Sequence, residues 1–160
     1  MSKNKITPFL WYDKEAEDAA NFYVSIFKNA KINTIARYPE GSGYQAGTVM
    51  TVAFELDGQH FNAINGGPHF KLSEAISFTV DCNDQAEVDY YWESLLAGGG
   101  QESQCGWLKD RYGLSWQITP RQLIDLTTSA DKAQNNRVFA AMMKMKKIDV
   151  AELERAAAAA

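Results

Sequence analysis

The feature of this sequence that most restricts its fold is an internal repeat. The segment ITPFLWYDKEAEDAANFYVSIF (6–27) aligns without a gap with ISFTVDCNDQAEVDYYWESLLA (76–97), at an offset of 70 residues (76 − 6 = 70). Each copy begins with a short apolar run, passes through a polar turn and continues through Ala-Glu into a segment of helical periodicity. A repeat of this length indicates that the chain is built from two copies of one supersecondary unit.

Each copy contains large apolar side chains at a spacing of three to four residues, which predicts one amphipathic helix per copy. These side chains are Ala19, Phe22, Tyr23 and Ile26 in the first copy and Val88, Tyr91, Trp92 and Leu95 in the second. Asp13 and Asp84 are the predicted N-caps or first-turn acids of the two helices. The run Gly98-Gly99-Gly100 is the predicted end of the second helix.

Antiparallel strands are predicted after each helix. In the first copy the strand-like runs are 31–38, 49–56 and 60–64, and Asp57-Gly58 has the composition of a two-residue hairpin turn. In the second copy 106–109 and 114–119 flank a charged turn that ends at Gly113. The predicted fold class is therefore α+β, with tandem βαβββ modules at 5–67 and 74–120.

The character of the chain changes after Pro120. Helical patterns at 122–127, 131–144 and 150–155 predict a C-terminal helical extension over 121–155. The run Ala156–Ala160 is interpreted as a poly-Ala tail outside the fold. The two modules and the extension are predicted to form one domain over 1–155.

Composition excludes several classes of partner. The chain has a net charge of −4 and no basic stripe, so no nucleic-acid partner is expected. No apolar run could span a bilayer, and the N-terminal residues lack the continuous apolar stretch of a signal peptide, so no membrane partner is expected. Cys82 and Cys105 stand in different segments and make no disulfide framework, which favours a cytoplasmic location.

Two βαβββ modules in tandem resemble the vicinal oxygen chelate fold, also called the glyoxalase/bleomycin-resistance fold. ITPFLWYD with AEDAANFYVSIF, and VMTVAFELDGQHFNAINGGPHF with its GGPxF link, resemble the first module of its PhnB-like branch, the 3-demethylubiquinone 3-methyltransferase-like family. EAISFTVDCNDQAEVDYYWESLLAGGG and CGWLKDRYGLSWQITP resemble the second module. The resemblance spans residues 5–148 and implies the fold, which hosts lyases, isomerases, dioxygenases and metal-free binding proteins.

The resemblance also implies a cleft between curled sheets, often built across a homodimer. Enzymes of this fold hold a divalent metal there, through His or Glu on the first strand and Glu or His on the last strand of each module. At those strands this sequence has Thr7, Pro8, Phe9, His60, Asn62, Asn65, Ser77, Phe78, Thr79 and Gln117. Only His60 is a normal ligand of a catalytic divalent ion, so no metal and no other cofactor is predicted.

Strand alternation predicts which side chains face the cleft. Ile76, Phe78 and Val80 are expected to pack on the second helix, which leaves Ser77, Thr79 and Asp81 on the opposite face. The repeat offset then places Thr7, Phe9 and Trp11 on the cleft side of module one. The predicted ligand-binding cleft consists of Phe9, Trp11, His60, Asn62, Ser77, Thr79, Cys105, Trp107 and Gln117.

Each of these residues also has an ordinary structural interpretation. Phe9 and Trp11 can instead be ordinary residues of the core or of a dimer interface. His60 can be a strand residue that faces water beside the hairpin turn. Cys105 has no base close in sequence that would lower its pKa, which favours a small buried thiol.

Three functional hypotheses follow. The first is a cytoplasmic homodimer that binds a small aromatic or amphipathic molecule in a metal-free cleft, because the Gln117 amide can recognise a ligand but cannot act as a general base. The second is an enzyme of the same fold, metal-dependent or using His60, of the lyase, isomerase or dioxygenase type. The third is an interaction protein whose C-terminal helices bind a partner through Phe139, Met142, Met143 and Met145.

Methyl transfer is not favoured by the sequence. A Rossmann-type cofactor loop requires a glycine motif after a strand and before a helix. Gly98-Gly99-Gly100 follows a helix instead, and Asn65-Gly66-Gly67-Pro68 leads toward another strand. No catalytic residue is assigned.

Overall fold

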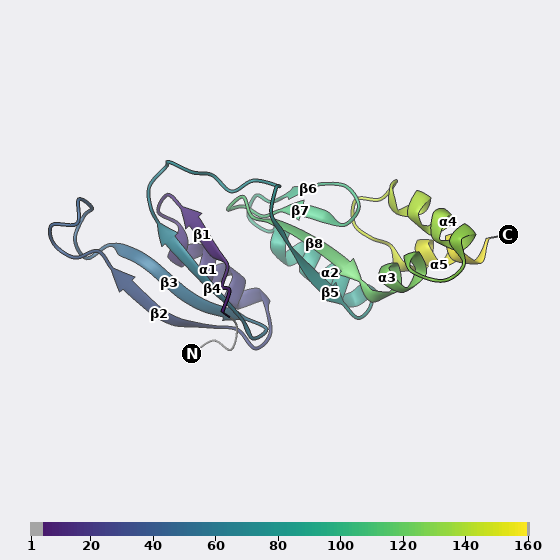
Figure 1. Ribbon diagram of the computed structural model, residues 1–160, viewed down its shortest axis with the longest axis horizontal. Coiled ribbons are helices and arrows are strands. Elements are labelled where there is room, and N and C mark those ends of the chain that lie inside the picture. Colours follow the sequence, from purple (N-terminus) through teal and green to yellow (C-terminus); the bar gives the residue numbers. More distant parts are fainter. Residues whose placement is uncertain (1–4, 160) are drawn as a thin grey trace. The chain divides into compact units, whose positions relative to one another are not determined.

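The computed structural model describes residues 5–159, which form two compact units that divide between Leu72 and Ser73. Figure 1 shows the elements of both units, and each unit is described by itself. No helix among these residues is long and apolar enough to cross a membrane.

The first unit is a four-stranded sheet with one helix. Its elements are β1 (Phe9–Tyr12), α1 (Ala16–Ile26), β2 (Lys31–Arg37), β3 (Val49–Leu56) and β4 (Gln59–Asn65). The strand order is β1-β4-β3-β2, with β1 parallel to β4 and the other pairs antiparallel. The predicted Asp57-Gly58 turn is confirmed, since both residues have positive φ angles (47° and 79°), as a hairpin turn of this length requires.

The core of the first unit lies between α1 and one face of its sheet (Figure 1). Apolar positions at helical spacing on α1 meet alternate residues of the strands, because side chains of a strand point to opposite faces in turn. Tyr23 of α1 is 1% exposed and stacks on Phe54, which in turn stacks on Phe61 with ring centroids 5.4 Å apart. This stack of three rings fixes the helix on the sheet.

The second unit repeats this plan. Its elements are β5 (Ser77–Cys82), α2 (Gln85–Leu96), β6 (Gln101–Glu102), β7 (Trp107–Lys109) and β8 (Ser115–Pro120), in the order β5-β8-β7-β6. The register is also repeated: Phe9 lies opposite Asn62, and its repeat equivalent Thr79 lies opposite Gln117. The predicted α+β fold of tandem βαβββ modules is therefore confirmed.

Two local predictions were wrong and one was right. Asp13 does not cap α1; the N-cap residue is Glu15, and the first helical N–H, that of Ala16, donates instead to Asn65 Oδ1 at 2.8 Å. Asp84 does cap α2, since its Oδ1 accepts from the Glu87 N–H at 2.9 Å. Ile76 does not pack on α2, because it precedes β5 and is 68% exposed.

The extension forms α3 (Arg121–Thr127), α4 (Lys132–Met142) and α5 (Val150–Ala158). Its buried cluster consists of Leu123, Val138, Ile148 and Leu153. Helix α5 continues past the predicted end at 155 into the alanine run. Ala157 packs against the cluster, and the Arg137 guanidinium donates to the carbonyl oxygens of Ala156 and Ala157. The first part of the alanine run thus belongs to the fold, because alanine favours helix and Arg137 satisfies carbonyls at the helix end.

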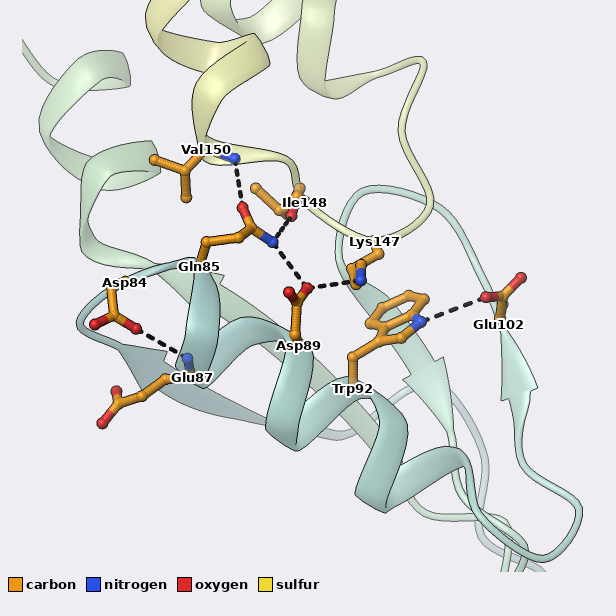
Figure 2. Close-up of polar contacts among 9 residues, drawn as sticks. All are labelled: Asp84, Gln85, Glu87, Asp89, Trp92, Glu102, Lys147, Ile148 and Val150. Carbon is orange, nitrogen blue, oxygen red and sulfur yellow. Dashed lines mark hydrogen bonds and ion pairs between the residues drawn. The ribbon is translucent and has the colours of Figure 1, made fainter.

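The extension is joined to α2 through Gln85 (Figure 2). The Gln85 amide donates to Ile148 O at 3.1 Å and to Asp89 Oδ1 at 3.0 Å, and its oxygen accepts from the Val150 N–H at 2.8 Å. Lys147 Nζ lies 2.6 Å from Asp89 Oδ1. The Gln85 amide therefore hydrogen-bonds both to the first residue of α5 and to the segment that precedes it.

Candidate functional site

The side of each sheet opposite its helix is called here the open face. In the first unit Leu10 and Tyr12 of β1 are buried against α1, and Phe9, which alternates with them, is 57% exposed on the open face. Asn62 and His60 of β4 lie on the same face, because Asn62 is the register partner of Phe9 and His60 is two residues away. Phe9 is therefore not a core residue of this unit.

His60 has an acidic partner across the hairpin. The register of β3 and β4 pairs it with Glu55, and its Nε2 lies 3.2 Å from Glu55 Oε1. Asn33 Nδ2 donates to the same oxygen at 3.2 Å, and Lys31 Nζ lies 3.8 Å from Glu55 Oε2. Glu55 was absent from the predicted site, although the two-residue turn alone places it opposite His60.

Trp11 is held against the segment that leaves β4. Its Nε1–H donates to Gly67 O at 2.9 Å, and its ring meets the edge of Phe70 with centroids 4.9 Å apart. A Cβ atom on Gly66 would stand 2.2 Å from the indole ring. Trp11 is thus a half-buried residue on the predicted face, and its ring is fixed. Position 66 requires glycine, because the indole ring lies too close to its backbone for a Cβ atom.

Replacing Gly66 by alanine is expected to destabilise the first unit by about 1–2 kcal/mol, because the added methyl group overlaps the Trp11 ring. Urea unfolding followed by fluorescence measures this change. The double variant Gly66→Ala/Trp11→Leu provides the control, since a smaller side chain at position 11 removes the overlap. A Gly66→Ala protein as stable as the original would contradict the close contact.

In the second unit the predicted residues Ser77, Thr79, Trp107 and Gln117 share the open face. Thr79 and Trp107 are the register partners of Gln117 on its two sides, and Gln117 Nε2 donates to Ser77 Oγ at 2.9 Å. All but Thr79, which is exposed, are half-buried. The structure therefore gathers two hydroxyls, an amide and an indole on neighbouring strands.

A small cavity of about 140 Å³ lies beside this group, lined by Trp107, Lys109, Ser115 and Glu74 among others. Lys109 Nζ lies 2.6 Å from Glu74 Oε1, and this hydrogen bond is the main cause that holds the pKa of Glu74 below its usual value. The Ser115 hydroxyl is 1% exposed and has no hydrogen-bond partner among residues 5–159. A buried hydroxyl without a partner is costly, so the Ser115 hydroxyl is available to hydrogen-bond with a polar group that enters the cavity.

The two cysteines lie elsewhere. Cys105 has a positive φ angle (58°), its N–H donates to Met145 O, and its Sγ lies 3.7 Å from Met143 Sδ in the extension. The thiol of Cys105 therefore meets the extension rather than the amide and hydroxyl group of the open face. Cys82 is buried, and burial together with Glu87, Asp81 and Asp84 raises its pKa to about 12, which keeps the thiol protonated.

The residues do not fit the divalent metal that the fold implies. The repeated register defines four equivalent positions on the first and last strands, occupied by Phe9, Asn62, Thr79 and Gln117. None of these side chains is an imidazole, carboxylate or thiolate. Within residues 5–159 no group of three or more His, Cys, Asp and Glu side chains is placed to hold a metal ion.

Comparison with known proteins identifies the family. Residues 4–119 match the profile of the 3-demethylubiquinone-9 3-methyltransferase family. A Bacillus cereus PhnB protein, described as a candidate 3-demethylubiquinone-9 3-methyltransferase, is 36% identical with a TM-score of 0.66, over 73% of this chain and 99% of that one. A search of curated proteins gave no match.

Two more distant structures share the fold. A protein from Pseudomonas aeruginosa is 15% identical with a TM-score of 0.61, over 74% of this chain and 98% of that one. The fosfomycin resistance protein FosX from Listeria monocytogenes, solved with Mn(II) and sulfate, is 15% identical with a TM-score of 0.52, over 75% and 91%. Together with the repeated βαβββ topology, these matches show that the chain belongs to the PhnB-like, 3-demethylubiquinone-9 3-methyltransferase family and has the vicinal oxygen chelate fold.

Proposed function

We propose that this protein binds a small aromatic or amphipathic molecule on the open faces of its sheets, without a divalent metal, as a cytoplasmic homodimer. The observation that carries the proposal is the pair of amides, Asn62 and Gln117, at equivalent register positions of the last strands. An amide both donates and accepts hydrogen bonds, so it recognises a ligand without taking up a proton.

Neighbouring side chains support a ligand of this class. In the first unit the exposed Phe9 ring adjoins Asn62, and in the second the Trp107 indole adjoins Gln117, so each amide has an aromatic surface beside it. Ser77, Thr79 and the Ser115 hydroxyl, which has no partner in residues 5–159, add polar capacity. Rings for stacking with a few polar groups for orientation are typical of small-molecule sites.

The exposed apolar side chains support the homodimer. Phe9 and Phe70 are 57% and 65% exposed in the first unit, and such rings are stabilised when a second copy covers them. Size-exclusion chromatography with light scattering tests this part. A monomer at micromolar concentration contradicts it.

Methyl transfer, the reaction in the family name, is not proposed. The turns that join a strand to the following helix are Asp13-Lys14-Glu15 and Asn83-Asp84, and neither contains a glycine. A nucleotide-type cofactor needs glycines there so that the backbone can approach its phosphates or ribose closely. The sheets of the described residues are also mixed four-stranded sheets rather than a doubly wound parallel sheet.

Replacing Gln117 by alanine is expected to weaken ligand binding about five- to tenfold, because one polar contact to the ligand and the tie to Ser77 are lost. The ligand is first found by a thermal-shift screen of small aromatic compounds, and its affinity is then measured by calorimetry. Gln134→Ala on α4 is the matched control and should bind normally. Unchanged affinity in Gln117→Ala would exclude this amide from the site.

Elemental analysis of the purified protein tests the metal-free part of the proposal. Stoichiometric Zn, Ni, Mn or Fe that is lost in the His60→Ala variant would overturn it. This outcome would overturn the absence of a metal but not the binding of a ligand on the open faces, so the two parts of the proposal are tested separately.

A second candidate function is favoured by the His60–Glu55 pair. A carboxylate 3.2 Å from the imidazole can hold the ring in one orientation, as a general base requires. In an enzyme of the lyase or isomerase type, His60→Gln abolishes turnover of a bound ligand and retains its binding. In a binding protein, the ligand is recovered unchanged from both proteins.

A further inference from the structure

A second cavity, of about 580 Å³, lies in the first unit where β1 and β4 end. One wall is formed by the loop between β2 and β3, and the other by the turn and first residues that begin α1. Its volume is within the range of small-ligand sites, roughly 300–1000 Å³. None of the residues proposed above to bind the ligand lines it, so this cavity is a separate site.

The loop wall is a fixed pair of aromatic rings. Tyr38 and Tyr44 stack with centroids 4.2 Å apart and an interplanar angle of 12°. The Tyr38 hydroxyl donates to Asn65 O at 2.6 Å, and the Tyr44 hydroxyl donates to Gly66 O at 3.4 Å. Burial, then Tyr44, raises the pKa of Tyr38, so its hydroxyl remains a donor. Tyr44 is nevertheless 48% exposed, so an amphipathic ring is held at the surface without being part of the core.

The distance between the two walls is fixed by Asn65. Its Oδ1 accepts from the Ala16 N–H at the start of α1, and its Nδ2 donates to Val49 O at the start of β3, at 3.2 Å. The loop itself is closed by the Tyr38 N–H to Thr48 O and the Gly47 N–H to Tyr38 O, both at 2.9 Å. The cavity is therefore preorganised, which lowers the entropic cost of binding.

The opposite wall is acidic. Asp13, Glu17 and Asp18 line it, and within residues 5–159 their carboxylates make no ion pair and accept no side-chain or backbone hydrogen bond. Among the described residues that line the cavity, Lys14 is the one of positive charge. Acids in the first turn stabilise a helix, which accounts for Glu17 and Asp18. Helix stabilisation does not account for Asp13, which precedes α1, or for the stacked rings across the cavity.

We propose that this cavity binds a small organic cation of the alkylammonium class between the tyrosine pair and the carboxylates. Aromatic faces attract a cation through the ring quadrupole, and they also cover its alkyl groups. The carboxylates supply the charge that distinguishes a cation from a neutral molecule of the same shape. The cavity and the ring pair carry the proposal, and the carboxylates determine the sign of the ligand charge.

The test compares choline with its neutral carbon isostere, 3,3-dimethyl-1-butanol, by two-dimensional amide NMR of the full chain. Choline should shift the amides of residues 13–18, 38–49 and 65–67 with a millimolar Kd, and the isostere should bind at least about fivefold more weakly. Tyr44→Leu should weaken choline binding roughly three- to fivefold. Glu17→Gln/Asp18→Asn should weaken it by a similar factor and reduce its dependence on salt.

Matched controls separate the site from general effects. Tyr90→Leu removes a tyrosine of similar exposure (47%, against 48% for Tyr44) on α2, and Glu93→Gln removes an exposed carboxylate there. Both variants should bind choline normally. Tyr44→Phe keeps the ring and should stay within about twofold of the original affinity. Equal binding of choline and the isostere, shifts at other residues, no shifts at all, or unchanged affinity in a folded Tyr44→Leu protein would each overturn the proposal.

Discussion

The Asp110→Ala variant is expected to lose about 3–4 kcal/mol of stability in the second unit. Asp110 is 3% exposed in the turn between β7 and β8. Its Oδ1 accepts from the N–H groups of Tyr112 and Leu114, at 2.8 and 3.1 Å, and its Oδ2 accepts from Trp116 Nε1–H at 2.9 Å. Alanine removes these three acceptor contacts, two of which are buried.

Urea unfolding and amide hydrogen exchange in β7 and β8 measure this loss. Asp110→Asn retains one acceptor oxygen and should fall between the two proteins. Asp125→Ala removes an exposed aspartate from α3 and should change the free energy of unfolding by less than about 0.5 kcal/mol. If Asp110→Ala and Asp125→Ala were equally stable, the three hydrogen bonds would not be important for the hairpin.

The Gln85→Ala variant is expected to release the extension, at a cost of about 2–3 kcal/mol, because three hydrogen bonds meet at this amide. Two of them hold the backbone at Ile148 and Val150, where α5 begins (Figure 2). Protection of the α5 amides from exchange should fall by about two orders of magnitude, while β5 and β8 keep theirs. Asn136→Ala, which removes an exposed amide on α4, is the control.

The contact between α2 and the extension also depends on pH. The hydrogen bond from Lys147, followed by that from Gln85, lowers the pKa of Asp89. A carboxyl whose pKa is lower in the folded protein stabilises it above the unfolded pKa, and this contribution disappears as the pH falls through 3.8 and below. In Gln85→Ala the part of the free energy of unfolding that is lost on acidification should be smaller.

Uniform loss of amide protection throughout the second unit of Gln85→Ala would instead show that the extension does not open separately.

Most of the fold could be predicted from the sequence because its signals are local. The repeat gave the module count, the Asp57-Gly58 pair gave the hairpin, and strand alternation gave the faces of Phe9 and Trp11. One failure arose where a distant residue decides a local outcome. Asp13 was predicted to serve the start of α1, but the Ala16 N–H that begins the helix donates to Asn65, 49 residues away.

The candidate site was less predictable for the same reason. A charged turn is usually solvated, and no pattern near position 110 shows that Asp110 is buried and accepts a hydrogen bond from Trp116. The placement of Cys105 against Met143 depends on how the extension packs, and no pattern near position 105 encodes that. The cavity bounded by Tyr38 and Tyr44 depends on hydroxyl bonds to a segment more than twenty residues away.

The shared register of the two sheets has a consequence for how this protein can change. Because Phe9–Asn62 and Thr79–Gln117 are matched positions on matching backbones, side chains can be exchanged between the copies without moving a strand. Such a chain can acquire a different set of open-face side chains on each unit by point substitution alone. A single-residue insertion in β4 or β8 has the opposite effect, since it turns the amide of that strand away from the open face of its own sheet and toward the helix.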